Sequence, residues 1–344
     1  AACGGSETAA PTEENTATTE ETKEEAPAEK AEETAEEVAA EVPAGGKVGV
    51  CIYKFDDAFM TTYRNALQAI LEEKGYEVSV VDGNNDQAKQ TEQVNTFITQ
   101  GVDALIINPV MTSAADTIIA AVKQANIPTV LINREPTAEQ MAAYDKLVYV
   151  GCDAAQSGTF QGEIISDLGL DAIDKNGNGK IDYVMIEGDP ENVDAKYRTE
   201  FSIKALEDAG LEVECLDDQV GNWDQATAQQ LVANSLSQYG DDVEVVFCNN
   251  DAMALGALQS IEAAGRTVGE DIYLVGVDAL TEALDNVASG KMTGTVFNDH
   301  FSQSHAAAIA AANYLTGTEN EHYIGCDYVK VTADNVADIQ EKLK

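Results

Sequence analysis

The chain has 344 residues, a formal net charge of −41 and 44% hydrophobic residues, which is enough apolar material for about two domains with real cores. A charge of this sign repels nucleic acid and anionic lipid headgroups, so neither is an expected partner. No apolar run reaches the length of a membrane-spanning helix.

The first 46 residues differ in composition from the rest of the chain. They contain 13 Glu and 2 Lys, a net charge of −11, and Val38 and Val42 are their only large apolar side chains. The remaining −30 of the total −41 belongs to residues 47–344. Because so little apolar surface can be buried, we expect residues 1–46 to be a disordered acidic linker whose charges repel one another.

The N-terminal sequence AACGGS is similar to the end of a bacterial lipoprotein signal, in which two small residues precede a cysteine. In that interpretation Cys3 carries a lipid that anchors the protein to the outer side of the cell membrane, and the acidic linker separates the anchor from the folded part. The alternative is a cysteine that lies near the end of the chain by chance.

Five further cysteines show no metal-binding or disulfide spacing, since they form no CxxC pair and an odd number cannot all pair with one another. Cys51 and Cys248 lie in apolar, strand-like runs, where a free cysteine acts as a small hydrophobic residue. The others are Cys152, Cys215 and Cys326. The sequence therefore indicates neither a disulfide framework nor a cysteine-bound metal.

From Lys47 onward, apolar strand-like runs alternate with amphipathic helical patterns. In the helix expected over 57–75, for example, Phe59, Tyr63 and Leu67 share one face. The expected strands are 47–55, 77–83, 104–109, 129–133, 183–189, 211–216, 243–251, 272–278 and 294–299. The expected helices are 57–75, 86–101, 113–126, 193–209, 225–239, 252–264, 282–289 and 302–315.

Continuous apolar strands that alternate with amphipathic helices are typical of doubly wound parallel α/β sheets. The strands are too numerous for one sheet of ordinary size, so we predict two α/β lobes. In such sheets ligands bind beyond the carboxyl ends of the strands. Almost every expected strand ends in Asp or Asn, and none in a glycine-rich phosphate loop; the residues are Asp56, Asp57, Asn108, Asp189, Asn249, Asn250, Asp251, Asp278, Asn298 and Asp299.

These carboxylates and amides suit a neutral polyol, because each hydroxyl can donate to a carboxylate and accept from an amide or an arginine. Flat aromatic side chains would cover the apolar faces of a sugar ring, and Phe59 and Trp223 are the candidates. Asp194 and Arg198 are one helical turn apart and follow a strand, where they could hold a ligand. For any single position, helix capping or a surface ion pair is the alternative role.

The segment DKNGNGKID, residues 174–182, has the alternating oxygen-bearing side chains of an EF-hand calcium loop, with Gly179 at the sixth position. The twelfth position, where a Glu normally closes such a site, is Met185. From these residues alone, the segment is either a calcium site closed by a distant carboxylate or a plain acidic turn.

Signals for catalysis are weak in this sequence. His300, His305 and His322 have no metal or nucleophile spacing around them. The chain contains no dinucleotide-binding glycine motif after a strand, no Walker motif and no nucleophile elbow. We therefore predict a binding protein and not an enzyme.

A resemblance to a known family is carried by eight strings that occur in order: CIYKFDDAFM, ALIINP, YVGCD, VMIEGDPENVDAKYRT, GNWDQA, FCNNDAMALGA, LVGVDAL and TVFNDHF. Together they resemble the galactose/glucose-binding branch of the periplasmic-binding-protein family, from about residue 47 to the C-terminus. The resemblance implies two Rossmann-like lobes joined by a three-segment hinge, with one sugar between them. The lobes would be 47–152 plus 298–331 and 153–297 plus 332–344.

The resemblance also implies which residues form each site. The sugar contacts would be Asp57, Phe59, Asn108, Asn192, Asp194, Arg198, Trp223, Asn250, Asp278 and Asn298, with the two aromatic rings on opposite faces of the sugar. A Glu from a distant strand would close the calcium loop, whose ligands would be Asp174, Asn176, Asn178, the Lys180 carbonyl, Asp182 and Glu244. Glu187 is nearer in the sequence, but its strand leads away from the loop.

By the same resemblance, the protein would be a monomer stabilised by a structural Ca²⁺ that delivers D-galactose or D-glucose to the permease of an ABC importer by hinge closure. Asn192 stands where the family has His, which puts the preference among hexoses in question. Ribose, xylose or arabinose are alternative ligands, and a chemoreceptor is an alternative partner. A sugar-responsive repressor of the same fold would need a basic DNA-binding segment where this chain has its acidic linker.

Overall fold

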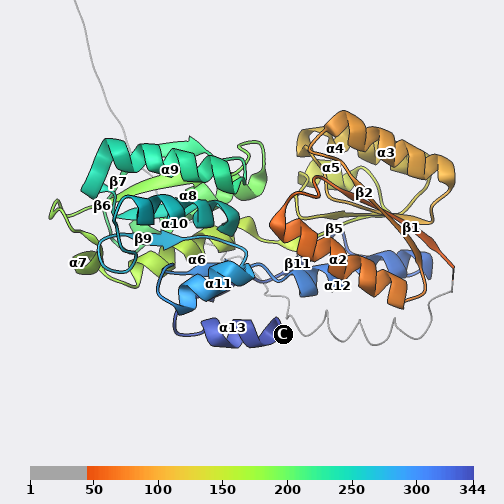
Figure 1. The fold of residues 1–344 in the computed structure, drawn as a ribbon. Helices are drawn as coiled ribbons and strands as arrows, with labels where there is room; N and C mark the ends of the chain where they lie inside the picture. The colour runs from red at the N-terminus through yellow and green to blue at the C-terminus, as the bar shows by residue number, and fades with distance from the viewer. Residues whose placement is uncertain (1–44) are drawn as a thin grey trace, which may run out of the picture.

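The computed structural model describes residues 45–344, which form two α/β lobes side by side (Figure 1). Cys3 and nearly all of the expected acidic linker lie in residues 1–44, outside the described part of the chain. None of the helices within 45–344 combines the length and the hydropathy that a bilayer crossing requires.

The N-terminal lobe is built on a parallel sheet of six strands in the order β11-β5-β4-β3-β1-β2. Its elements are β1 (Lys47–Ile52), α2 (Ala58–Glu73), β2 (Glu77–Asp82), α3 (Gln87–Gln100), β3 (Ala104–Ile107), the 3-10 turn η1 (Thr112–Ala114), α4 (Ala115–Gln124), β4 (Thr129–Ile132), α5 (Ala138–Ala142), β5 (Leu147–Cys152), α12 (His300–Leu315) and β11 (Tyr323–Cys326).

Both faces of this sheet are covered, which explains why its strands are apolar throughout. Alternate residues of β1 serve opposite faces: Val48, Val50 and Ile52 pack with α2 and α12, whereas Cys51 packs with α3 and α4. Because α12 follows β10 of the C-terminal lobe in the sequence, the N-terminal lobe is completed by a second, later segment of the chain.

The C-terminal lobe contains a parallel sheet in the order β7-β6-β8-β9 and an antiparallel pair, β10 with β12. Its elements are α6 (Ala154–Ser166), α7 (Leu170–Ile173), β6 (Ile181–Glu187), α8 (Val193–Asp208), β7 (Val213–Val220), α9 (Gln225–Tyr239), the 3-10 turn η2 (Gly240–Asp242), β8 (Val245–Cys248), α10 (Asp251–Ala263), β9 (Tyr273–Val275), α11 (Thr281–Ala288), β10 (Thr295–Phe297), β12 (Val329–Val331) and α13 (Val336–Lys342).

Helices α9, α10, α11 and α13 cover one face of this lobe, and α6 and α8 cover the other. The predicted architecture, two doubly wound lobes, is therefore confirmed.

The chain passes between the lobes three times, from β5 to α6, from β10 to α12, and from β11 to β12. The last passage is short, since it spans only the residues between Cys326 and Val329. Strand β12 pairs with β10, so residues 329–331 belong to the C-terminal lobe. The resemblance implies instead that the N-terminal lobe extends to residue 331.

Candidate functional site

A cleft between the lobes collects polar and aromatic side chains from both of them. Its cavity volume is about 30 Å³, so the two lobes are closed on one another and their side chains fill the space. The lining residues are Tyr53, Asp57, Phe59, Met60, Asn133, Arg134, Asn192, Asp194, Arg198, Trp223, Asn250, Asp278 and Asn298. Nine of the ten predicted sugar contacts are among them, and Asn108 is not.

Asp57 both caps α2 and faces the cleft. One carboxylate oxygen, Oδ1, accepts from the backbone N–H of Met60 at 2.7 Å, and the other accepts from the hydroxyl of Tyr53. The helix begins immediately after this residue, which places Phe59 in its first turn and on the cleft wall. Capping and ligand binding are thus compatible roles for Asp57.

Asn108 lies one layer behind the cleft and is completely buried. Its Oδ1 accepts from the backbone N–H of Tyr53 at 3.2 Å, and its Nδ2 donates to Oδ1 of Asn133 at 3.3 Å. The residue that reaches the cleft is Asn133, which follows β4 with a left-handed φ of 66°. Asn108 therefore has a supporting position, and Asn133, which also ends an expected strand, is one of the lining residues that sequence reasoning missed.

Arg134 is a second lining residue that the sequence did not single out. Only 4% of its surface is exposed, its guanidinium lies 4.0 Å from the centroid of the Tyr53 ring, and Nη1 donates to the carbonyl of Val110. Its Nε has no protein partner. A buried cation therefore faces the carboxylates of the cleft, which moderates their mutual repulsion.

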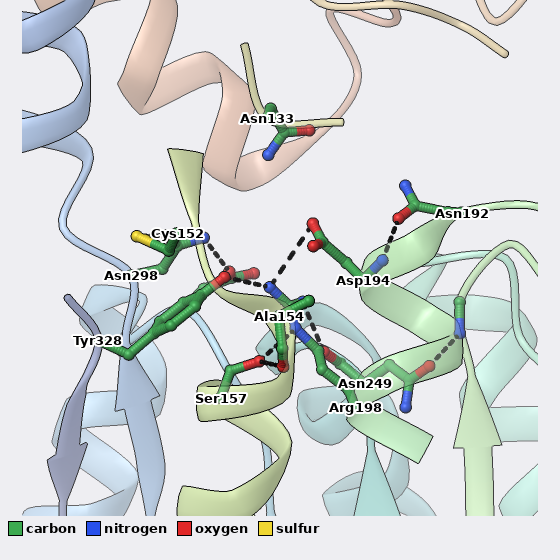
Figure 2. A network of polar contacts seen from close by, with 12 residues as sticks. Asn133, Cys152, Ala154, Ser157, Asn192, Asp194, Arg198, Asn249, Asn298 and Tyr328 are labelled. Carbon is green, nitrogen blue, oxygen red and sulfur yellow. Dashed lines mark hydrogen bonds and ion pairs between the residues drawn. The ribbon is translucent and has the colours of Figure 1, made fainter. Parts of the chain in front are cut away.

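The start of α8 contributes Asn192 and Asp194 to the cleft. Asn192 is the N-cap, and its Oδ1 accepts from the backbone N–H of Asp194 at 2.7 Å (Figure 2), which leaves the amide nitrogen for another acceptor. Burial raises the pKa of Asp194, while the nearby cations Arg198 and Arg134 oppose this shift. The carboxylate of Asp194 lies 3.9 Å from Nη2 of Arg198.

Arg198 is held on three sides by neutral acceptors (Figure 2). Nε donates to Oγ of Ser157 at 3.1 Å, Nη1 to the carbonyl of Asn249 at 2.9 Å, and Nη2 to the hydroxyl of Tyr328 at 3.0 Å. These contacts fix the plane of the guanidinium before any ligand arrives. Tyr328 lies in the passage from β11 to β12, so the site is joined directly to the hinge.

Trp223 forms the aromatic wall on the side of the C-terminal lobe. It has a φ of 66°, and a Cβ at Gly188 would lie 2.3 Å from its ring, so the indole can occupy this place only because residue 188 has no side chain. Asn250 caps α10 by accepting from the N–H of Met253 at 3.0 Å, and its Nδ2 donates to the Trp223 carbonyl at 3.4 Å.

Asp278 and Asn298 complete the cleft. Nδ2 of Asn298 donates to Oδ1 of Asp278 at 3.1 Å. Asp278 has a φ of 126°, a conformation that costs a non-glycine residue about 1–3 kcal/mol and is typical of functional positions. Burial raises the pKa of Asp278 well above its usual range, with Arg198 acting in the opposite direction.

The acidic loop 174–182 is folded around its own carboxylates. Asp174 accepts from the backbone N–H groups of Gly177 at 2.7 Å and Gly179 at 2.8 Å. Oδ2 of Asp182 accepts from the side-chain amides of Asn176 at 2.6 Å and Asn178 at 2.8 Å. Gly177 and Gly179 have φ of 74° and 79°, the left-handed conformation that the tight turns need.

Glu244, which precedes β8, closes this loop in space. Its Oε1 accepts from the N–H of Asp182 at 3.0 Å, and its Oε2 accepts from the N–H of Lys175. Glu187 lies elsewhere, beside the carboxyl of Asp218 at the other end of β6. The distant carboxylate therefore reaches the loop, as the resemblance implies, and the nearer one does not.

The loop offers oxygen atoms of the kind that Ca²⁺ prefers. Within residues 45–344 no cluster of three or more His, Cys, Asp or Glu side chains has the arrangement of a metal site. However, Asp174, Asn176, Asn178 and Asp182 all belong to this loop, Glu244 contacts it, and their carboxylate and amide oxygens are ligands that Ca²⁺ accepts. The residues fit the ion in their chemistry, and calcium binding stays a prediction.

Comparison with known proteins places residues 48–319 in a family described as the periplasmic binding protein domain. The chain is 37% identical over 310 residues to the D-galactose/methyl-galactoside binding periplasmic protein MglB of Haemophilus influenzae, which covers 86% of this chain and 92% of that protein. It is 34% identical to a putative rhizopine-binding protein of Rhizobium meliloti, with 86% and 93% covered.

Among solved structures, an ABC transporter solute-binding protein of Bacillus halodurans with bound myo-inositol matches with a TM-score of 0.77 and 29% identity. The match covers 87% of this chain and 98% of that one. The names of these relatives thus indicate different polyol ligands: galactosides for one and myo-inositol for another.

Proposed function

The chain belongs to the periplasmic binding protein family, and from this premise we propose that it binds D-galactose or D-glucose between its lobes and delivers the sugar to an ABC importer. Proteins of this family act outside the cytoplasm as sugar-binding parts of transport systems and not as enzymes. The observation that carries the proposal is the cleft, where carboxylates, amides and two aromatic walls from both lobes converge.

The charges of the cleft favour a neutral polyol. Asp57, Asp194 and Asp278 would accept hydrogen bonds from sugar hydroxyls, and the amides of Asn250 and Asn298 would donate to them. Arg134 and Arg198 partly neutralise the charge of the carboxylates, so a strongly charged ligand would leave buried charges without a partner. Phe59 and Trp223 provide apolar surface for the faces of the ring.

Asn192 is expected to tune the choice among sugars. Its free amide nitrogen can donate to one hydroxyl, but with a shorter reach than the His that the resemblance implies for this position. A hydroxyl left without a partner would weaken binding by about 1–3 kcal/mol, or one to two decades in Kd. This makes ribose, xylose, arabinose and cyclitols the compounds against which the hexoses must be tested.

The proposed mechanism is hinge closure. Because both lobes line the cleft, a sugar can touch all of its partners only when the lobes are together, and binding therefore shifts the population toward the closed state. The closed protein would then be recognised by the permease of the importer, with a chemoreceptor as an alternative partner. We propose that the protein works as a monomer, with Ca²⁺ in the loop 174–182 and a lipid anchor on Cys3.

The experiment that tests the proposal is isothermal titration calorimetry of the full chain with calcium present. D-galactose, D-glucose, D-ribose, D-xylose, L-arabinose and myo-inositol are titrated in turn. We expect one-to-one binding of a hexose with a Kd on the order of 1 μM or below. Asp278→Ala is expected to abolish the heat while leaving sugar-free melting nearly unchanged. Tighter binding of a pentose or of myo-inositol would overturn the hexose assignment.

A further inference from the structure

Two cysteines lie next to each other where the chain leaves the N-terminal lobe. Cys152 ends β5, Cys326 ends β11, and the two residues are register partners in the parallel pair that these strands form. Neighbouring strands lie about 4.8 Å apart. That spacing falls within the range of about 4.4–6.8 Å between the Cα atoms of disulfide-bonded cysteines.

The two side chains also share one side of the sheet. Register partners on adjacent strands project to the same face, and both thiols pack against one apolar cluster that includes Ile164 and Tyr328. Cys152 is buried and Cys326 is half-buried, so Cys326 is the more accessible residue of the pair.

The other described cysteines have different neighbours. In the sheets, Cys51 is opposite Val81 and Ile107, Cys248 is opposite Ile186, and Cys215 is opposite Tyr183. They therefore serve as internal controls for the reactivity of the adjacent pair.

We propose that Cys152 and Cys326 form a reversible disulfide that ties two of the three hinge passages together. Cys152 precedes the passage from β5 to α6, and Cys326 precedes the passage from β11 to β12. The third passage carries Asn298, whose Oδ1 lies 4.0 Å from Sγ of Cys152, and Figure 2 shows the two side chains together. All three passages thus meet at this pair of thiols.

The disulfide would change the position of cleft residues through Asn298. The thiol of Cys152 donates to the Oδ1 of Asn298, and the amide of Asn298 in turn donates to Asp278 at 3.1 Å. Oxidation removes the S–H donor and restrains the backbone of two passages. The effect on sugar binding rests on the proposed function, whereas the disulfide itself does not.

The chemistry is thiol–disulfide exchange with a small-molecule or protein disulfide as the oxidant. The Cys326 thiolate attacks one sulfur of that disulfide, and the other sulfur leaves as a thiol after it takes up a proton. Cys152 then loses its proton and attacks the sulfur of Cys326, which releases the second thiol. Two protein thiols are oxidised and one disulfide is reduced, so atoms and electrons balance.

This order of attack agrees with the environment of each thiol. Burial raises the pKa of Cys152 well above its usual range, so the more accessible Cys326 meets the oxidant first. An extracytoplasmic protein works where disulfides form and persist.

The disulfide is tested by peptide mapping of the full chain. The protein is exposed to oxidised glutathione, its remaining thiols are blocked with N-ethylmaleimide in denaturant, and protease fragments are identified by mass spectrometry. We expect a fragment in which Cys152 is linked to Cys326 and which dithiothreitol separates. Cys215→Ser should keep this fragment, and Cys326→Ser should lose it. Recovery of both cysteines in the blocked form after oxidation would overturn the proposal.

The effect on the site is tested by titrating the hexose that binds into oxidised and reduced protein. We expect affinity to fall about 2- to 10-fold on oxidation, the loss associated with one hydrogen bond, and to return on reduction. Cys326→Ser should show no such change. Equal affinities for the oxidised and reduced protein would overturn the link to the cleft. Absence of binding in reduced protein would overturn the proposed function and leave the disulfide in place.

Discussion

Nη2 of Arg198 donates to the hydroxyl of Tyr328 at 3.0 Å, and this contact joins a cleft residue of α8 to the passage between β11 and β12. Both side chains are buried. The hydroxyl is therefore one of the acceptors that orient the guanidinium, and it belongs to one of the three hinge passages. Neither residue would show this relationship in the sequence, where they are 130 positions apart.

Tyr328→Phe is expected to weaken sugar binding about 5- to 20-fold. The substitution keeps the ring and removes the acceptor, which leaves one N–H of a buried cation without a partner and lets Arg198 turn away from its binding position. Titration calorimetry measures the change. Tyr323→Phe is the matched control, because Tyr323 lies five residues earlier, at the start of β11, and is 43% exposed. An unchanged Kd for Tyr328→Phe would show that Ser157 and Asn249 suffice to orient the guanidinium.

Gly188→Ala is expected to displace Trp223 and to reduce sugar affinity by at least about tenfold. The added Cβ would lie 2.3 Å from the indole ring, far inside van der Waals contact, so the ring must leave its place. Trp223 is the only tryptophan of the chain, and its fluorescence therefore reports the displacement directly. Gly46→Ala, in which the new Cβ meets Tyr76 at 3.0 Å outside the cleft, should leave both readouts unchanged.

Glu244→Gln is expected to abolish the effect of calcium on melting. In the unchanged protein, a calcium concentration of 100 times Kd should stabilise the fold by about 2.7 kcal/mol, and EDTA should remove this gain. The variant loses one negative charge of the closing carboxylate, so melting curves with calcium and with EDTA should coincide. Glu214→Gln is the control, since this exposed carboxylate is not a predicted ligand and pairs only with Nζ of Lys180, whose predicted contact with the ion is through its backbone carbonyl. A variant that still responds to EDTA would exclude Glu244 as the closing ligand.

The architecture could be predicted from the sequence because buried parallel strands and amphipathic helices leave strong periodic signals. The strands that the periodicity did not predict are β5, β11 and β12. The last two have only 4 and 3 residues, and Tyr323 at the start of β11 is exposed, so their sequences carry little apolar pattern. Such short strands are specified by their neighbours in the sheet and not by their own residues.

The cleft residues that could be predicted from the sequence are mainly those that directly follow an expected strand. Asn108 and Asn133 both end strands, and only the three-dimensional layering shows that the first supports the second. Arg134 could not be predicted as a cleft residue, because its position depends on stacking over Tyr53, which is distant in the sequence. The pairing of Cys152 with Cys326 depends on strand register between distant segments, which no local pattern encodes.

Acidification from pH 8 to pH 5.5 is expected to raise the melting temperature of the sugar-free protein. Burial, together with a hydrogen bond to the Asp218 carboxyl, raises the pKa of Glu187 from 4.5 to about 7, and burial raises that of Asp251 to about 6. A carboxyl whose pKa is higher in the folded state binds protons more tightly there than in the unfolded chain. The contribution of Glu187 to stability is therefore fully present below pH 4.5 and is lost as the pH rises through 7, and that of Asp251 is lost as the pH rises through 6.

Calorimetric or fluorescence melting in EDTA measures this slope without the pH dependence of calcium binding. Glu187→Gln, which carries no titrating group at this position, should flatten the slope around pH 7 and raise the melting temperature at pH 8. Part of the slope should remain, because Asp251 still titrates and protonation lowers the net charge of −41. A melting temperature that falls on acidification over this range would show that Glu187 is already ionised at little cost in the folded protein.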